Sequence, residues 1–129
     1  MQPEQIEHIN VLNWFTHNYP DLADDFHHFA NERRCSVQQG RLLKRMGVKK
    51  GVSDFFLAVA LGGFHGMWLE LKTGKGKLTS EQFDFLERKR DRGYCARVAH
   101  GSDEAKEAIL FYLDNHVSNS SINMPKNWS

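Results

Sequence analysis

The chain has 129 residues, of which 40% are hydrophobic and 26% charged, and its formal net charge at pH 7 is +1. This length suffices for one domain with a modest core and is too short for two. The sequence has no apolar run near the roughly 20 residues of a membrane span and no signal-peptide layout, so we expect a cytoplasmic protein, in the host cytoplasm if the source is viral. Cys35 and Cys95 have neither metal-binding nor redox spacing, and we expect two reduced thiols.

The two signs of charge are separated along the first part of the chain. Residues 1–32 contain six acidic residues and no Lys or Arg, whereas residues 33–50 contain seven basic residues and no acid. Such a block is typical of a track that binds a polyanion, although it also suits a solvated helix face. We favour nucleic acid, and the candidate DNA-binding residues of the block are Arg33, Arg34, Arg41, Lys44, Arg45, Lys49 and Lys50.

Residues 3–18 are predicted to form the first helix, because a Pro suits the first turn and an apolar stripe through Val11 and Trp14 follows at helical spacing. Glu7 falls within this stripe. A carboxylate in that position either reaches water at the edge of the stripe or points at a cation. Glu4 lies on the same face and is the alternative candidate.

Residues 26–30 are predicted to form a short strand. His27 and His28 are adjacent on it, so their side chains point apart and form no metal pair. Residues 31–34 are predicted to form a loop. Ser36 then caps a helix that we expect to run to residue 46 and to end at Gly47.

Residues 54–72 are predicted to form a β-hairpin whose turn is the glycine pair at positions 62 and 63. Residues 55–61 are apolar enough for a strand covered on both faces, and alternation along the second strand places Glu70 and Lys72 on one face. If the pairing is centred on position 62, Asp54 lies opposite Glu70 and points the same way. A strict two-residue turn would point Asp54 to the other face, so a shared site requires an odd-length connection or a bulge.

The loop at residues 73–78 contributes Lys75 and Lys77 as further candidate phosphate contacts, or as solvated side chains. Thr79 and Gln82 fit a capping box that opens a helix ending near residue 93. Gln82 either only closes this box or also faces the site. We expect a third strand at residues 94–99, a last helix at 102–113 and a polar, flexible tail at 114–129, so that residues 1–113 form the domain.

Four segments together resemble the VRR-NUC (virus-type replication-repair nuclease) family of the PD-(D/E)XK nucleases. They are residues 47–54 (GVKKGVSD), 62–66 (GGFHG), 70–72 (ELK) and 75–82 (KGKLTSEQ). The resemblance runs from about residue 4 to residue 113. Ser53 stands where the family usually has Pro, a change that leaves the metal chemistry untouched. The fold that this resemblance implies is α/β, a restriction-endonuclease-like core with a small mixed β-sheet flanked by helices.

The resemblance also implies a site for Mg²⁺ or Mn²⁺. Its metal ligands would be Asp54, Glu70, the Leu71 carbonyl and, directly or through water, Glu7. Lys72 would orient or deprotonate the attacking water, and Gln82 would complete the catalytic set. Hard oxygen ligands suit Mg²⁺, and the sequence has no His/Cys cluster at the ligand spacing of zinc. The competing interpretation of Asp54, Glu70 and Lys72 is a buried structural salt bridge.

The function implied by the resemblance is a structure-selective DNA endonuclease that acts on branched DNA, such as Holliday junctions, in phage replication, recombination or repair. Because the chain has no room for an added DNA-binding domain, we expect a symmetric homodimer. One alternative is a non-catalytic DNA-structure-binding subunit, which the intact carboxylate and lysine residues disfavour. Another is a metal-dependent hydrolase of nucleotides, which the basic block disfavours.

Overall fold

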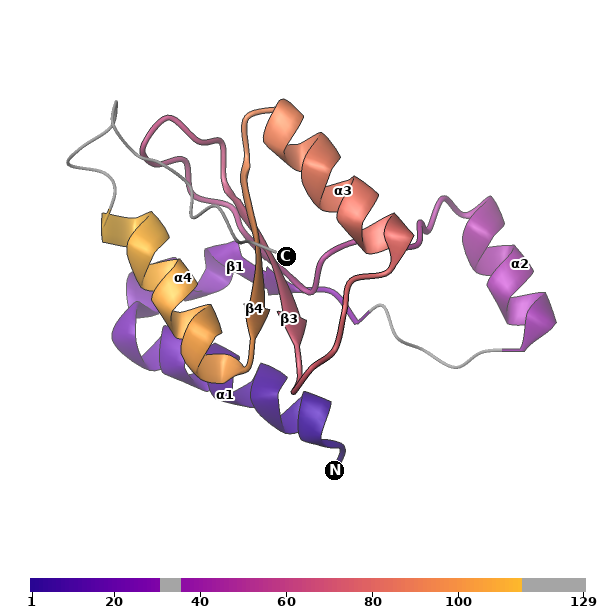
Figure 1. Ribbon diagram of the computed structural model, residues 1–129, viewed down its shortest axis with the longest axis horizontal. Helices are drawn as coiled ribbons and strands as arrows, with labels where there is room; N and C mark the ends of the chain where they lie inside the picture. The colour runs from indigo at the N-terminus through magenta and orange to yellow at the C-terminus, as the bar shows by residue number, and fades with distance from the viewer. Residues whose placement is uncertain (31–35, 115–129) are drawn as a thin grey trace.

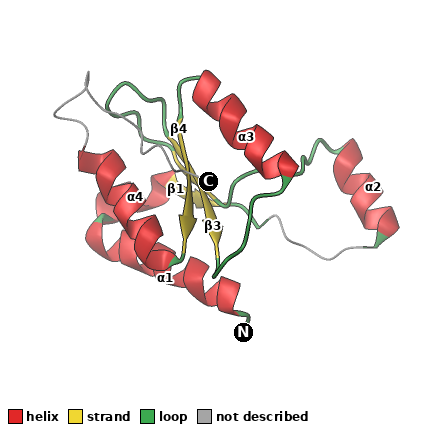
Figure 2. Cartoon of the chain, viewed as in Figure 1, coloured by secondary structure: helices red, strands yellow, loops and turns green. Residues whose placement is uncertain are grey.

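Four strands form a single sheet in the order β1-β2-β3-β4 in the computed structural model (Figures 1 and 2). The pairs β1/β2 and β2/β3 are antiparallel, and β3/β4 is parallel. The structure describes residues 1–30 and 36–114. Its elements are α1 (Pro3–Asn18), the 3₁₀ helix η1 (Pro20–Asp25), β1 (Phe26–His28), α2 (Val37–Arg45), β2 (Phe55–Leu57), β3 (Met67–Lys72), α3 (Ser80–Asp91), β4 (Cys95–His100) and α4 (Ser102–Asp114).

Helices cover both faces of the sheet, and the alternation along the strands divides the core between them. On one face, α1 and α4 pack over a cluster that includes Phe55, Leu69 and Cys95. On the other face, α3 packs over a smaller cluster that includes Ala96 and Val98. The parallel pair β3/β4 is joined through α3, as the connection between parallel strands requires. The predicted mixed sheet with flanking helices is therefore confirmed.

The β2–β3 hairpin has the register that would bring Asp54 opposite Glu70. Phe55 pairs with Leu69 and Leu57 with Met67, which centres the paired strands on position 62. At the tip, however, Leu61 pairs with Phe64 around a two-residue turn, and both central glycines have positive φ values of 59° and 87°. The two registers differ by one residue. The predicted bulge is thus present, between the tip and the body of the hairpin.

Strand β2 is shorter than expected, which corrects the prediction of one strand over residues 55–61. Only residues 55–57 form the strand, and the chain that follows finds other partners. The Ala58 N–H donates to the Asp25 carbonyl at 2.8 Å, and the Val59 carbonyl accepts a hydrogen bond from the Tyr112 hydroxyl of α4. These contacts satisfy backbone groups that the ladder would otherwise bind. Burial raises the pKa of this Tyr112 to about 12, so its hydroxyl stays a donor.

The predicted helix caps are present. Ser36 Oγ accepts from the Gln39 N–H at 3.1 Å, and Thr79 Oγ1 accepts from the Gln82 N–H at 3.1 Å.

The predicted loop at residues 31–34 and nearly all of the predicted tail lie outside the described residues, as do Arg33, Arg34 and Cys35. Burial raises the pKa of the Cys95 thiol to about 12. Of the helices in the described part of the chain, none combines the length and apolarity that crossing a bilayer demands.

Candidate active site

Asp54 lies immediately before β2 and is buried, with 5% of its surface exposed. Its Oδ2 accepts a hydrogen bond of 2.8 Å from the backbone N–H of Leu71, the residue between Glu70 and Lys72. The loop that carries Asp54 packs against the start of α3 at Gly51, where a Cβ would lie 2.5 Å from the Glu81 carbonyl oxygen and φ is +86°. A side chain at position 51 would therefore displace the loop. The glycine therefore permits the close packing of this loop on α3.

Glu70 is almost fully buried on β3, with 1% of its surface exposed. Lys72 Nζ lies 3.8 Å from its Oε2, so the lysine supplies the positive charge that a buried carboxylate needs. The sequence prediction that Glu70 and Lys72 share a face agrees with this ion pair. Two buried carboxylates therefore lie at this end of β3: Glu70 is paired with Lys72, and Asp54 is bound to the backbone of the residue between them.

Gln82 performs both of the roles that the sequence left open. Its Oε1 accepts from the Thr79 N–H at 2.9 Å and closes the capping box of α3. Its Nε2 donates to Glu70 Oε2 at 3.4 Å. The amide therefore ties the beginning of α3 to the carboxylate of β3 and restricts the orientation of that carboxylate.

Glu7 of α1 meets the beginning of α4. Its Oε2 accepts a hydrogen bond from the backbone N–H of Ser102, the first residue of that helix. A carboxylate at this place satisfies one of the four N–H groups that a helix leaves without internal partners, and it complements the positive end of the helix dipole. Sequence reasoning missed this contact because the two residues are 95 positions apart. The role of Glu7 as a metal ligand stays a prediction.

A solved structure described as a "VRR_NUC domain protein" is similar to this chain, with a TM-score of 0.75 and 31% sequence identity. The match covers 88% of this chain and 90% of that chain. This chain belongs to the VRR-NUC family. No protein-family model and no curated protein matches the sequence. The family resemblance and the nuclease-type fold expected from the sequence are confirmed.

Two histidines of this VRR-NUC domain approach Asp54, which corrects the expectation that no cluster suits a metal of the zinc class. His8 Nε2 of α1 lies 3.7 Å from Asp54 Oδ2, and the ring centroids of His8 and His28 lie 4.8 Å apart. Among the described residues, these three are the group whose ligand atoms all lie within 4.8 Å of one another. Burial lowers the pKa of His28, and His8 lowers it further, against the opposing effect of Asp54. No spacing rule could find this group, because its members come from three separate segments.

The described basic residues of the block at positions 33–50 are at the surface of the VRR-NUC domain. Arg41, Lys44 and Arg45 are exposed on α2, and Figure 1 shows this helix apart from the sheet and the other helices. Lys49 and Lys50 are exposed in the loop that leads from α2 to Asp54. These residues extend from α2 toward the buried carboxylates along one continuous stretch of chain.

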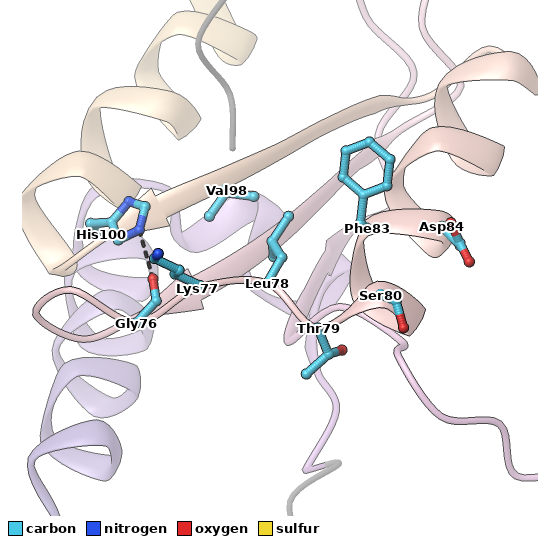
Figure 3. A pocket seen from close by; sticks show the side chains of 9 residues that line it. All are labelled: Gly76, Lys77, Leu78, Thr79, Ser80, Phe83, Asp84, Val98 and His100. Carbon is cyan, nitrogen blue, oxygen red and sulfur yellow. Dashed lines mark hydrogen bonds between the residues drawn. The ribbon is translucent and has the colours of Figure 1, made fainter.

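Lys75 and Lys77 are exposed in the loop between β3 and α3. Lys77 borders a hollow of about 470 Å³ at the beginning of α3 (Figure 3). His100 lies at the same hollow, and its Nε2 is 3.0 Å from the Gly76 carbonyl oxygen, a contact that holds the loop against β4. The hollow is lined by Gly76, Lys77, Leu78, Thr79, Ser80, Phe83, Asp84, Val98 and His100.

Proposed function

We propose that this VRR-NUC domain is a metal-dependent, structure-selective DNA endonuclease that hydrolyses phosphodiester bonds in branched or junction DNA. Its cellular context would be replication, recombination or repair, including that of a phage. The observation that carries the proposal is the burial of two carboxylates at the end of β3: Glu70, whose Oε2 is 3.8 Å from Lys72 Nζ, and Asp54, which binds the Leu71 N–H. Two buried carboxylates concentrate negative charge, which a bound divalent cation would stabilise.

The donor set fits Mg²⁺ or Mn²⁺, which prefer oxygen ligands. Asp54, Glu70 and the Leu71 carbonyl would hold the ion, with Glu7 as a further ligand, directly or through water. When bound, such an ion supplies an activated water and relieves charge on the phosphate. Asp54 is held by the Leu71 N–H and Glu70 by the Gln82 amide, so both carboxylates are oriented before any ion arrives.

Lys72 would act on the attacking water, either by orienting it or by accepting its proton. Its ammonium also offsets the negative charge that a phosphodiester brings into the site. A lysine that accepts a proton must first lose its own, which desolvation and a nearby cation favour.

The test is a cleavage assay with purified protein and Mg²⁺ on a four-way junction, a flap, single-stranded DNA and linear duplex of the same sequence. We expect cleavage of the branched substrates and little cleavage of the linear duplex. Tight binding of junctions with no cleavage in Mg²⁺ or Mn²⁺ would refute the endonuclease and support a DNA-structure-binding subunit instead.

The basic face of α2 would bind the phosphates of the DNA. At 100° per residue, Arg41, Lys44 and Arg45 lie on one side of this helix.

We expect the triple change of these residues to Gln to weaken DNA binding and to flatten its salt dependence. The slope of log affinity against log salt concentration should fall by about 0.9 for each phosphate that is no longer bound. Fluorescence anisotropy at several salt concentrations measures both effects. The control is Arg92→Gln, because Arg92 is also exposed but lies at the C-terminal end of α3, outside the basic block. If the slope of log affinity against log salt concentration is unchanged in the triple variant, these residues do not bind phosphate and belong to an ordinary solvated face of α2.

The opposite side of α2 is apolar and would contact a second copy of the chain. Leu42 and Met46 lie there and are 54% and 69% exposed, and α2 has no buried residue. An amphipathic helix of nine residues gains little stability by itself, so its apolar face is expected to be covered in the assembly. A homodimer would also place two sites on one branched substrate.

We expect Leu42→Glu together with Met46→Glu to convert the homodimer to a monomer at micromolar concentration. Val37→Glu is the matched control, because Val37 is 71% exposed but lies on the basic side of α2. Light scattering coupled to size exclusion gives the masses. A wild-type protein that is monomeric at these concentrations while it cleaves junctions would rule out the dimer.

A further inference from the structure

His8, His28 and Asp54 form a second candidate metal site at the edge of the proposed catalytic site. Their potential ligand atoms all lie within 4.8 Å of one another, and His8 Nε2 is 3.7 Å from Asp54 Oδ2. Ligands at 2.0–2.2 Å from a tetrahedral metal stand about 3.3 Å apart. The distances between the potential ligand atoms exceed that value by about 1.5 Å at most, and rotation of the side chains can bring the atoms that much closer.

The two imidazoles are held in place by packing against the same ring. His8 meets Phe55 edge-on at 5.5 Å between ring centroids, and His28 meets it at 5.0 Å. Phe55 is fully buried, so it provides a fixed wall for both histidines. Asp54 is its neighbour in the chain and is fixed by the Leu71 N–H. The three potential ligands are therefore gathered around one buried ring, within reach of a common ion after small side-chain rotations.

The chemistry of this group differs from that of the site at Glu70. Two imidazoles and one carboxylate are the ligands of zinc and of neighbouring first-row transition metals, whereas an all-oxygen set suits Mg²⁺. The side chain of His28 is exposed, which leaves a route by which an ion can enter and a direction for water ligands. Asp54 belongs to both groups.

We propose that His8, His28 and Asp54 bind one divalent transition-metal ion of the zinc class. Because Asp54 would then serve two ions, and two divalent cations repel each other, zinc at this site weakens the binding of Mg²⁺ beside Glu70. The consequence for cleavage, inhibition by zinc, rests on the proposed nuclease function. The binding of the transition metal does not.

The direct test is titration of the metal-free protein with Co²⁺, followed by visible absorption, and then displacement of Co²⁺ by Zn²⁺. We expect one site with the strong visible bands of imidazole-ligated, four- or five-coordinate Co²⁺. His28→Gln should lower the Co²⁺ affinity by about tenfold or more, since loss of even an indirect partner of a metal ligand costs that much. His27→Gln is the matched control, because the side chain of His27 points away on the same strand, and it should titrate like the wild type.

Glu70→Gln separates this proposal from the nuclease proposal. It removes a ligand of the catalytic ion and should lose cleavage, but it should keep the Co²⁺ bands, because Glu70 is outside the histidine group. In Mg²⁺-supported assays, zinc should inhibit the wild type. Absence of the bands in the wild type, or equal Co²⁺ affinity in His28→Gln, would overturn the site. Failure of the wild type to cleave any substrate while the bands appear would refute only the nuclease function.

Discussion

Asp54→Asn is expected to lower Mg²⁺-dependent cleavage at least about a hundredfold, since even one lost electrostatic donor in an enzyme costs about that much. The substitution keeps the shape of the side chain, and the amide oxygen can still accept the hydrogen bond from the Leu71 N–H. It removes one of the two buried negative charges, so metal occupancy should fall. DNA affinity without metal should hold or rise, because a carboxylate that repels phosphate has been neutralised. Calorimetric titration with Mg²⁺ or Mn²⁺, beside the cleavage assay, measures both effects.

Lys72→Ala is the comparison that separates chemistry from metal binding. It should also abolish cleavage, but it should leave metal affinity nearly intact because an ammonium group is no ligand. Removal of the lysine's positive charge from beside Glu70 should even favour the cation. The assignment of Asp54 would be wrong if its Asn variant bound metal normally and still cut DNA.

Phe55→Ala is expected to reduce the free energy of unfolding by about 3–5 kcal/mol. Phe55 is fully buried and stacks on Phe26 with a centroid distance of 5.1 Å and an angle of 8° between the rings. Its removal leaves a cavity beneath Asp54 and both histidines of the candidate zinc-class site. Urea denaturation followed by circular dichroism gives the loss of stability.

The control for this change is Phe83→Ala, which removes the same ring from a position that is 45% exposed. Its effect should stay within about 0.5 kcal/mol, as for most surface substitutions. Similar losses in the two variants would show that the wall formed by Phe55 does not stabilise the core in the way proposed.

Local patterns in the sequence were sufficient for the helix caps, and they narrowed the register of the hairpin to two possibilities. Thr79 and Gln82 act on backbone groups three residues away, so their spacing alone predicts the capping box. Alternation along the two strands left two registers open, and the observed pairing of Phe55 with Leu69, with its one-residue offset from the tip, is the one centred on position 62. The ion pair of Glu70 and Lys72 has the same origin, because residues two apart on a strand share a face.

The tertiary structure alone decided where β2 ends, because the partners of residues 58 and 59 come from η1 and α4. It also decided the second role of Gln82, whose amide reaches Glu70 only when α3 packs on the sheet.

By itself, then, the sequence determined the helix caps and the shared face of Glu70 and Lys72, because these depend on residues only two or three positions apart. It could not show the group of His8, His28 and Asp54, because α1, β1 and the loop before β2 meet only in the folded chain. Nor could it show that Glu7 caps α4. The direction of a side chain across a gap of many residues is set by the packing of whole elements, and no local period records that packing.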